Sequence, residues 1–404
     1  MVKHNIVTKD SGSARSVTWG SDEQVLADLG FQFELTRKFG RLSMLAMAFG
    51  ILGTWIAFAA SFGTGLTYGG PVTMLYGLLI ETFSVYCTAA SMAEILSVYP
   101  TNLGQAFWIL QLAEGRPWAK LFSYITAWIN MVGWWSLIGS SSVYSVNFFL
   151  AIINLYHADF VFQTWHYFII FEATIWITAL INMGAARHDK ILPWFNNILL
   201  FANLATFLCL LVGLLVSTGK NGSFQPASFV FGGWNNFTGW PNGLVFFLGF
   251  IQAAYGLTAF DSVIHMIEEL PNPTINGPKS MIWAIWVGAG TGAIFLVVCL
   301  FCIQNLEEVI NTPSGLPFVQ IMLDVLGTRG AAAGLISIQI QAVIGGVSIT
   351  TAASRLTFAL ARDHGIPFGN YFARISPYWK MPVRATFGQT CIVSLLGILF
   401  FISE

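Results

Sequence analysis

Long apolar stretches separated by short polar connections dominate the sequence from residue 42 onward. Each has the ~20 residues that a helix needs to cross a hydrocarbon core of ~30 Å. The nine stretches lie at about 42–66, 71–98, 121–152, 166–183, 193–217, 243–265, 281–303, 331–354 and 384–403. Backbone groups inside a bilayer must be hydrogen-bonded within the segment, and no repeated alternating strand pattern is present. The sequence therefore predicts an all-α membrane protein with nine spans.

The segment before the first apolar stretch has a different character. Residues 1–41 are polar and carry charges of both signs, without a short apolar run followed by a small-residue cleavage site. This pattern is not that of a cleaved signal peptide, so we expect the first span to direct insertion. The domain organisation that follows is a cytoplasmic N-terminal tail over 1–41 and a transmembrane domain over 42–404.

Two of the predicted spans contain a polar, irregular interruption near mid-membrane. One lies at 50–54 in the first span, and the other at 255–261 in the sixth. Interruptions at corresponding places in two halves of a membrane protein indicate a transport site formed by discontinuous helices. We therefore expect the protein to move a small polar molecule across the membrane.

The interruption in the first span suits an anion. Glycine lacks a Cβ, so the backbone at Gly50 and Gly53 can leave helical geometry and approach a ligand closely. Amide groups at the start of the next half-helix would then point toward a carboxylate. Tight helix packing is the alternative role for these glycines, but the second interruption favours a site. The substrate-binding residues expected here are Gly50, Ile51, Leu52, Gly53 and Thr54, whose hydroxyl adds a donor.

The interruption in the sixth span suits a cation. Carbonyl groups released from helical bonding would face an ammonium group, and aromatic faces would pack against its aliphatic or quaternary part. A zwitterion would then extend from one break to the other. Trp134 in the third span is a candidate for an aromatic wall, with core packing as its alternative. The binding residues expected on this side are Tyr255, Gly256, Leu257, Thr258, Phe260 and Trp134.

Three carboxyl groups fall within apolar spans, namely Glu81, Glu172 and Asp261. A buried carboxylate costs several kcal/mol unless it is paired, protonated or exposed to water. Burial favours the protonated form, which proton coupling requires. Asp261 is the candidate for proton coupling because it lies beside the break, whereas structural hydrogen bonding is favoured for the two glutamates.

Three further acidic residues, Glu94, Glu268 and Glu269, lie near the predicted cytoplasmic face. We expect them to form ion pairs with Arg355 or Arg362.

Composition and charge narrow the class of protein. The chain is 55% hydrophobic and 9% charged, with a mean hydropathy of +0.68, as is typical of multi-spanning membrane proteins. With an N-terminus inside, 16 of the 18 Lys and Arg residues fall on the cytoplasmic side, leaving Lys220 and Arg329 outside. A net charge of -1 gives no reason to expect nucleic acid as a partner. Without a nucleophile–base pair, phosphate loop or HExxH motif, we expect neither an enzyme nor a cofactor.

Three groups of residues form recognisable motifs. They are Ser91 through Pro100 with Gly104 and Trp108; Ala353-Ser354-Arg355 with Ala359, 361–363, Gly365 and Pro367; and Asn235 with Gly239-Trp240 and Glu268-Glu269. Together these motifs resemble the amino acid–polyamine–organocation superfamily, and within it the fungal permeases for γ-aminobutyrate (GABA) and choline.

This resemblance implies a LeuT-like inverted repeat of five plus five helices, broken at helices 1 and 6. It also implies about twelve helices, so we expect the second repeat to be incomplete here. In sodium-coupled relatives, hydroxyl groups of the eighth helix help to hold a cation, and Thr350 and Thr351 are the corresponding candidates. Fungal relatives generally use protons, so we expect proton rather than metal coupling.

The predicted function is secondary active transport of an amino-acid-like or quaternary amine solute of the GABA or choline class. It would proceed by proton symport and alternating access, in the plasma membrane rather than an organellar one. A non-transporting nutrient sensor and an inactive truncated permease remain as alternatives. We expect the complete gene product to transport, and the 404-residue form to do so poorly or not at all.

Overall fold

The computed structural model describes residues 39–157, 159–188 and 190–402. Within these ranges the regular structure is helical, apart from two isolated β-bridges. Eight described helices are long and apolar enough to cross a membrane, and a shorter apolar pair covers Asn242–Gly256. That pair falls where the sixth span is predicted. Apart from 39–41, the predicted N-terminal tail lies outside the described residues.

The first half of the chain contains the first five spans. They are the broken helix α2 (Arg41–Leu52), α3 (Thr54–Ala60) and α4 (Phe62–Thr67), then α5 (Gly70–Val98), α7 (Ala119–Asn154), α8 (Thr164–Ala186) and α9 (Ile191–Asn221). The short helix α6 (Gln105–Leu112) lies in the segment for which the sequence resembles a helix 2 exit, and it packs against α7.

The second half begins with α10 (Ala227–Gly232) and then the broken sixth helix. That helix consists of α11 (Asn242–Leu248), α12 (Phe250–Gly256), α13 (Ser262–His265) and the 3-10 turn η1 (Ile267–Glu269). Next come α14 (Pro273–Cys302), α15 (Leu306–Ile310), α16 (Pro317–Arg362), α17 (Gly369–Phe372) and α18 (Val383–Leu396), which continues as η2 (Gly397–Phe401).

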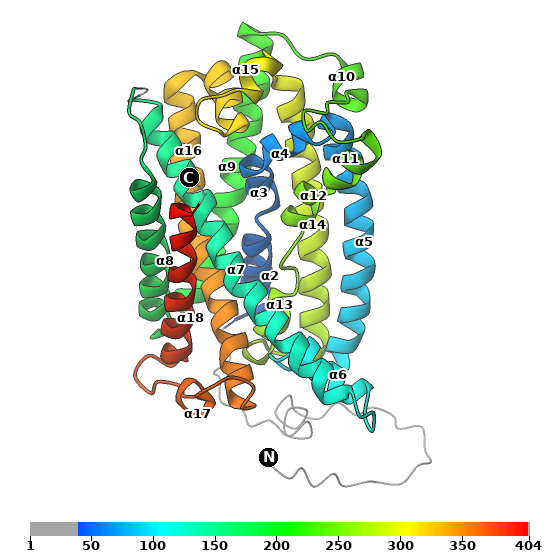
Figure 1. The fold of residues 1–404 in the computed structure, drawn as a ribbon, viewed down its shortest axis with the longest axis vertical. Helices are drawn as coiled ribbons and strands as arrows, with labels where there is room; N and C mark the ends of the chain where they lie inside the picture. The colour runs from blue at the N-terminus through cyan, green and yellow to red at the C-terminus, as the bar shows by residue number, and fades with distance from the viewer. Residues whose placement is uncertain (1–38, 158, 189, 403–404) are drawn as a thin grey trace.

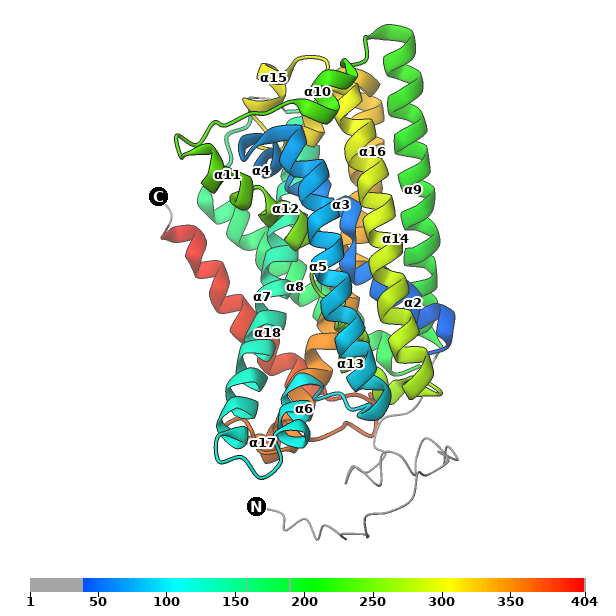
Figure 2. The same ribbon diagram turned by 90° about the vertical axis from the view of Figure 1, so that its right-hand side faces the viewer.

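The two broken helices lie in the middle of the bundle. Figure 1 shows α2 and α3 between α5 and α14 on one side and α8 and α18 on the other, with α7 crossing the view diagonally in front of them. Figure 2 shows α5 and α14 running alongside each other, and these two helices are in extensive contact. Helix α16 packs along both α7 and α9, and α9 in turn covers α2. Each break is therefore enclosed by protein rather than exposed to lipid.

The eighth span is longer than predicted. Helix α16 runs from Pro317 to Arg362 and contains one residue with non-helical angles, Gly327 (φ 68°, ψ 176°). The part after this kink continues past the predicted end at residue 354. Arginines near its end are accommodated because acidic residues of the sixth helix neutralise them.

Two ion pairs hold the end of α16 against the sixth helix. The Nε of Arg355 lies 2.8 Å from Oε1 of Glu269, and both side chains are buried. Arg362 lies 3.2 Å from Oε1 of Glu268. The expected pairing is present for these two glutamates. It is wrong for Glu94, whose side chain lies on an exposed face of α5.

Substitution of Glu269 tests how much the buried Arg355–Glu269 ion pair contributes to stability. We expect Glu269→Gln to destabilise the protein by about 3–5 kcal/mol, because the guanidinium of Arg355 stays buried without its partner. The matched control is Glu94→Gln, which changes an exposed side chain and should stay within about 0.5 kcal/mol. Thermal unfolding of both variants in detergent provides the measurement. Equal melting temperatures for the two would contradict the expectation.

Candidate functional site

The first helix is broken at a single residue. Gly53 adopts left-handed angles (φ 48°, ψ 35°) between α2 and α3, a conformation that costs little only for glycine. Gly50 remains helical, and a Cβ there would come 2.4 Å from Cδ2 of Leu199 on α9. Gly53 therefore makes the break, while Gly50 permits close helix packing.

The sixth helix is interrupted over a longer stretch. Helix α12 ends at Gly256 and α13 begins at Ser262, with Ala259 at a positive φ of 63°. Within the described part of the chain, no hydrogen-bond donor reaches the carbonyl oxygens of Gly256, Leu257 or Thr258. These acceptors are therefore available in the middle of the bundle.

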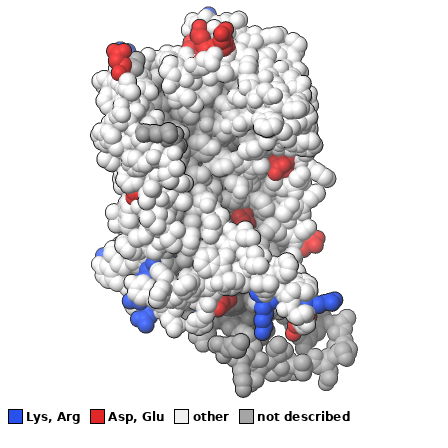
Figure 3. Space-filling model, viewed as in Figure 1, with Lys and Arg blue, Asp and Glu red and all other residues white. Residues whose placement is uncertain are grey.

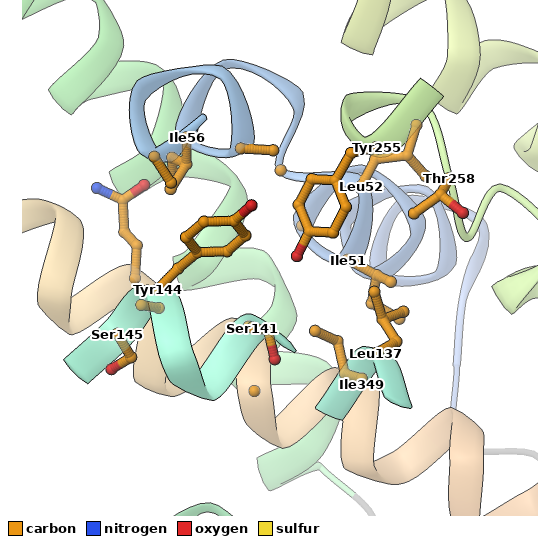
Figure 4. Close-up of a pocket in the computed structure, with 18 of the residues that line it drawn as sticks. Ile51, Leu52, Ile56, Leu137, Ser141, Tyr144, Ser145, Tyr255, Thr258 and Ile349 are labelled. Carbon is orange, nitrogen blue, oxygen red and sulfur yellow. The ribbon is translucent and has the colours of Figure 1, made fainter. Parts of the chain in front are cut away.

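Both breaks line one cavity, shown in Figure 4. Residues 50–53 contribute from the first helix, and Tyr255 and Thr258 from the sixth. One face of α7 supplies Leu137, Ser141, Tyr144, Ser145 and Phe148. Helix α16 supplies Gln341, Ala342, Gly345, Gly346 and Ile349.

The described lining of this cavity is mostly apolar and uncharged. It contains no Asp, Glu, Lys, Arg or His, and its polar side chains are hydroxyl groups and one amide. The rings of Tyr144 and Tyr255 meet edge to face with their centroids 5.3 Å apart. The hydroxyl oxygens of Tyr255 and Ser140 are 3.2 Å apart. Such a lining can bind a charged solute through dipoles and aromatic faces.

A second cavity adjoins the first. Leu137, Tyr255 and Thr258 line both, so the sixth-helix break forms a shared wall. The second cavity also exposes Asp261, whose side chain is 17% accessible, and Trp134 of α7. The predicted proton-coupling residue thus lies beside the first cavity rather than in its lining.

Five other predicted binding residues are packed away from the first cavity. Thr54 is completely buried, and a Cβ on Gly288 of α14 would come 2.6 Å from its Oγ1. Gly256 packs so closely that a Cβ would come 2.2 Å from Cε1 of Phe58. Leu257 is buried, and Phe260 packs against the apolar core. Trp134 lies edge to face on His265, with ring centroids 5.4 Å apart, instead of forming a wall of this cavity.

Of the two predicted cation candidates, Thr351 is engaged elsewhere, whereas the buried hydroxyl group of Thr350 has no hydrogen-bond partner among the described residues. The Oγ1 of Thr351 accepts a hydrogen bond from Asn182 of α8 and donates to the Val347 carbonyl at 2.8 Å. Thr350 is buried, and its carbonyl accepts from Gln389 at 3.1 Å. Neither residue belongs to the lining of the two cavities.

Sequence reasoning missed the contribution of α7. Ser141, Tyr144 and Ser145 line the cavity at a spacing of three and four residues, the repeat of one helix face. A hydroxyl-bearing stripe in an otherwise apolar span was the available signal.

Gly53 can be tested by substitution. We expect Gly53→Ala to cost about 1–2 kcal/mol, because an L-residue is strained in the left-handed region. Gly290→Ala is the control: it is exposed in the helix α14, and a Cβ there meets no atom within 4 Å. Alanine is favoured over glycine in a helix, so this control should be neutral or slightly stabilising. Melting temperatures measured in detergent distinguish the two, and a stable Gly53→Ala protein would contradict the assignment of the break.

Comparison with known proteins gives a consistent result. The GABA-specific permease of Saccharomyces cerevisiae is 30% identical over 97% of this chain and 68% of its own length. The choline transporter of the same yeast is 27% identical over 92% of this chain and 65% of its own. An uncharacterized amino-acid permease of Schizosaccharomyces pombe, C1039.01, is 30% identical over 93% and 65%. The chain thus spans about two thirds of the length of these three relatives.

Among solved structures, the crystal structure of MhsT in complex with L-phenylalanine matches with a TM-score of 0.61. It covers 89% of this chain and 78% of that one at 15% identity, which shows the fold alone. The fold is LeuT-like, with broken helices 1 and 6. The family model for amino acid permeases matches residues 39–404. The chain therefore belongs to the amino acid permease family, whose matched relatives here are transporters and not enzymes.

Proposed function

We propose that this permease carries a small amine-bearing solute of the GABA or choline class by alternating access, with the cavity at the two helix breaks as its binding site. One observation supports this most strongly. Helices separated by five spans in the sequence are both broken at the same cavity, where Gly53 faces Tyr255 and Thr258. Non-helical backbone at this depth in a membrane is tolerated where it is enclosed by protein or lines a cavity.

The chemistry of the two breaks supports a zwitterion. Residues Gly53, Ile56 and Ala57 line the cavity where helix α3 begins, and the amide groups there favour a carboxylate. Across the cavity, the backbone carbonyl group of Thr258 and the rings of Tyr144 and Tyr255 favour an ammonium group. A GABA-like solute uses both ends, whereas a choline-like solute uses only the second. We therefore favour the zwitterion.

The charge distribution supports a cytoplasmic N-terminus. Figure 3 shows Lys and Arg gathered at one end of the molecule, the end at which α6 and α17 lie in Figure 1. Positive residues are concentrated on the cytoplasmic side of membrane proteins. In this orientation the ion pairs of Arg355 and Arg362 lie toward the cytoplasm. Location in the plasma membrane and coupling to protons, with Asp261 as the carboxyl group involved, are part of the same proposal.

Labelled GABA and choline test the substrate class. We expect the purified chain to bind GABA saturably, and cells lacking their own carriers to take up GABA through a version extended to the length of the relatives. The same uptake measurement on the 404-residue form tests the expectation that this form transports poorly. Binding without uptake by either version would favour a non-transporting protein. Neither binding nor uptake of either compound, despite surface expression, would contradict the proposed substrate class.

A substitution at the cavity wall tests the site itself. We expect Ser141→Leu to weaken binding at least about tenfold, a loss of about 1.4 kcal/mol, because the larger side chain occupies the space next to Tyr144. The matched control is Ser84→Leu on an exposed face of α5, where an apolar side chain meets lipid. Equal affinities of the two variants would place the solute elsewhere.

A further inference from the structure

A buried histidine lies directly behind the predicted proton-coupling residue. His265 is completely inaccessible, one helical turn after Asp261. Its Nε2 lies 3.3 Å from Oδ2 of Asp261 and 3.4 Å from Nδ2 of Asn130. Its Nδ1 lies 3.0 Å from the carbonyl oxygen of Asn102. Both ring nitrogens therefore have partners.

These partners limit the protonation states of the pair. A carbonyl oxygen only accepts hydrogen bonds, so Nδ1 of His265 carries a proton and donates it to Asn102. If Asp261 were ionised and the ring neutral, a carboxylate oxygen would face the lone pair of Nε2 at 3.3 Å. One proton between these atoms removes the conflict, either as a carboxylic acid donating to Nε2 or as an imidazolium donating to Oδ2. Nδ2 of Asn130, 3.4 Å away, is the other donor from which Nε2 can accept, so the contact between Nε2 and Oδ2 is compatible with one shared proton.

We propose that Asp261 and His265 together form the proton-binding site of this permease, an inference that rests on the proposed transport function. The proton enters and leaves on the Asp261 side, since that carboxyl lines the second cavity while the imidazole is buried. On release, one O–H or N–H bond breaks and a water molecule of the second cavity takes the proton. No electron is transferred. The carboxylate and the Nε2 lone pair then repel each other, and their contact opens.

The histidine connects this site to the ion pairs at the end of the sixth helix. Asn102, which accepts from His265, donates its backbone N–H to Oε1 of Glu268 at 3.1 Å. The backbone N–H of Glu268 donates to Oδ1 of Asn102, also at 3.1 Å. Glu268 in turn pairs with Arg362 of α16. Loss of the proton therefore affects the segment between α5 and α6, and the Glu268–Arg362 ion pair holds that same segment in place.

The remaining neighbours of the pair are neutral. Gln105 of α6 donates to Oδ2 of Asp261 at 3.1 Å and accepts from Asn130 of α7 at 3.0 Å. Trp134 of α7 packs edge to face on the imidazole. Among the described residues, the ionisable and charged groups that face the Asp261–His265 pair or lie beyond Asn102 thus belong to two ion pairs. Glu268 with Arg362 is the nearer one, and Glu269 with Arg355 lies behind it.

The break in the sixth helix brings the proton and the solute onto one segment. Thr258 lines the first cavity, and Asp261, three residues later, lines the second. A solute contacting Thr258 and a proton on Asp261 therefore both act on the non-helical stretch between α12 and α13. This shared segment provides a physical route for coupling.

Transport assays with two variants test the role of His265. They use whichever form of the protein gives saturable uptake, with Asp261→Asn and His265→Gln. We expect both to lose uphill accumulation driven by a proton gradient by at least about tenfold, while exchange of labelled for unlabelled solute, which needs no net proton movement, is retained. The matched controls are Glu81→Gln on α5 and His166→Gln on α8, which keep both activities. Retained accumulation in His265→Gln would overturn the proposal. Loss of exchange together with accumulation would also overturn it, since that outcome marks a structural role.

A spectroscopic titration tests the proton site without any solute. The chain has six histidines, so ¹⁵N-histidine labelling of the purified protein allows His265 to be assigned by its loss in His265→Gln. We expect Nδ1 of His265 to stay protonated across the pH range and Nε2 to show a pH-dependent step that Asp261→Asn abolishes. An unchanged titration in Asp261→Asn would overturn the proposal. The expected titration in a protein that moves no tested solute would instead count against the proposed function and leave the proton site standing.

Discussion

The whole structure depends on the free-energy cost of an unpaired backbone polar group inside the bilayer. A peptide N–H or C=O that loses its helical partner in hydrocarbon costs several kcal/mol, so a helix can stop at mid-membrane only where protein encloses the gap. Two helices stop there, at Gly53 and after Gly256. The surrounding helices α5, α7, α14 and α16 are arranged so that both gaps are enclosed. The cavity is the consequence of that arrangement.

Much of the fold could be predicted from the sequence, because span length and apolarity are properties of single segments. The sixth span shows where this reasoning weakens. Its residues are apolar enough to cross, but the break divides it into the shorter pair Asn242–Gly256 and the single turn α13. The end of α16 was also missed, because its arginines look unfavourable until Glu268 and Glu269 are placed beside them. Pairing across 86 residues or more cannot be seen in a local window.

The site was predictable in its backbone and less so in its side chains. Glycine and irregular polarity mark where a helix stops, but successive side chains turn by about 100° around a helix axis. An error of one residue in the break therefore rotates a side chain onto another face. Thr54 illustrates this, since it directly follows Gly53 yet is buried against α14. The residues of α7 were missed because their role depends on which face of that helix meets the breaks.

The two cavities differ in the ionisable groups that line them. The first has hydroxyl groups, one amide and tyrosine rings, whereas Asp261 lines the second, and the two share only Leu137, Tyr255 and Thr258. If the first selects the solute and the second binds the energy source, their residues can diverge almost independently. Substitutions on α7 or α16 would then alter the cargo and leave the driving force intact. Such a separation of recognition from energy use would let one scaffold serve many nutrients during evolution.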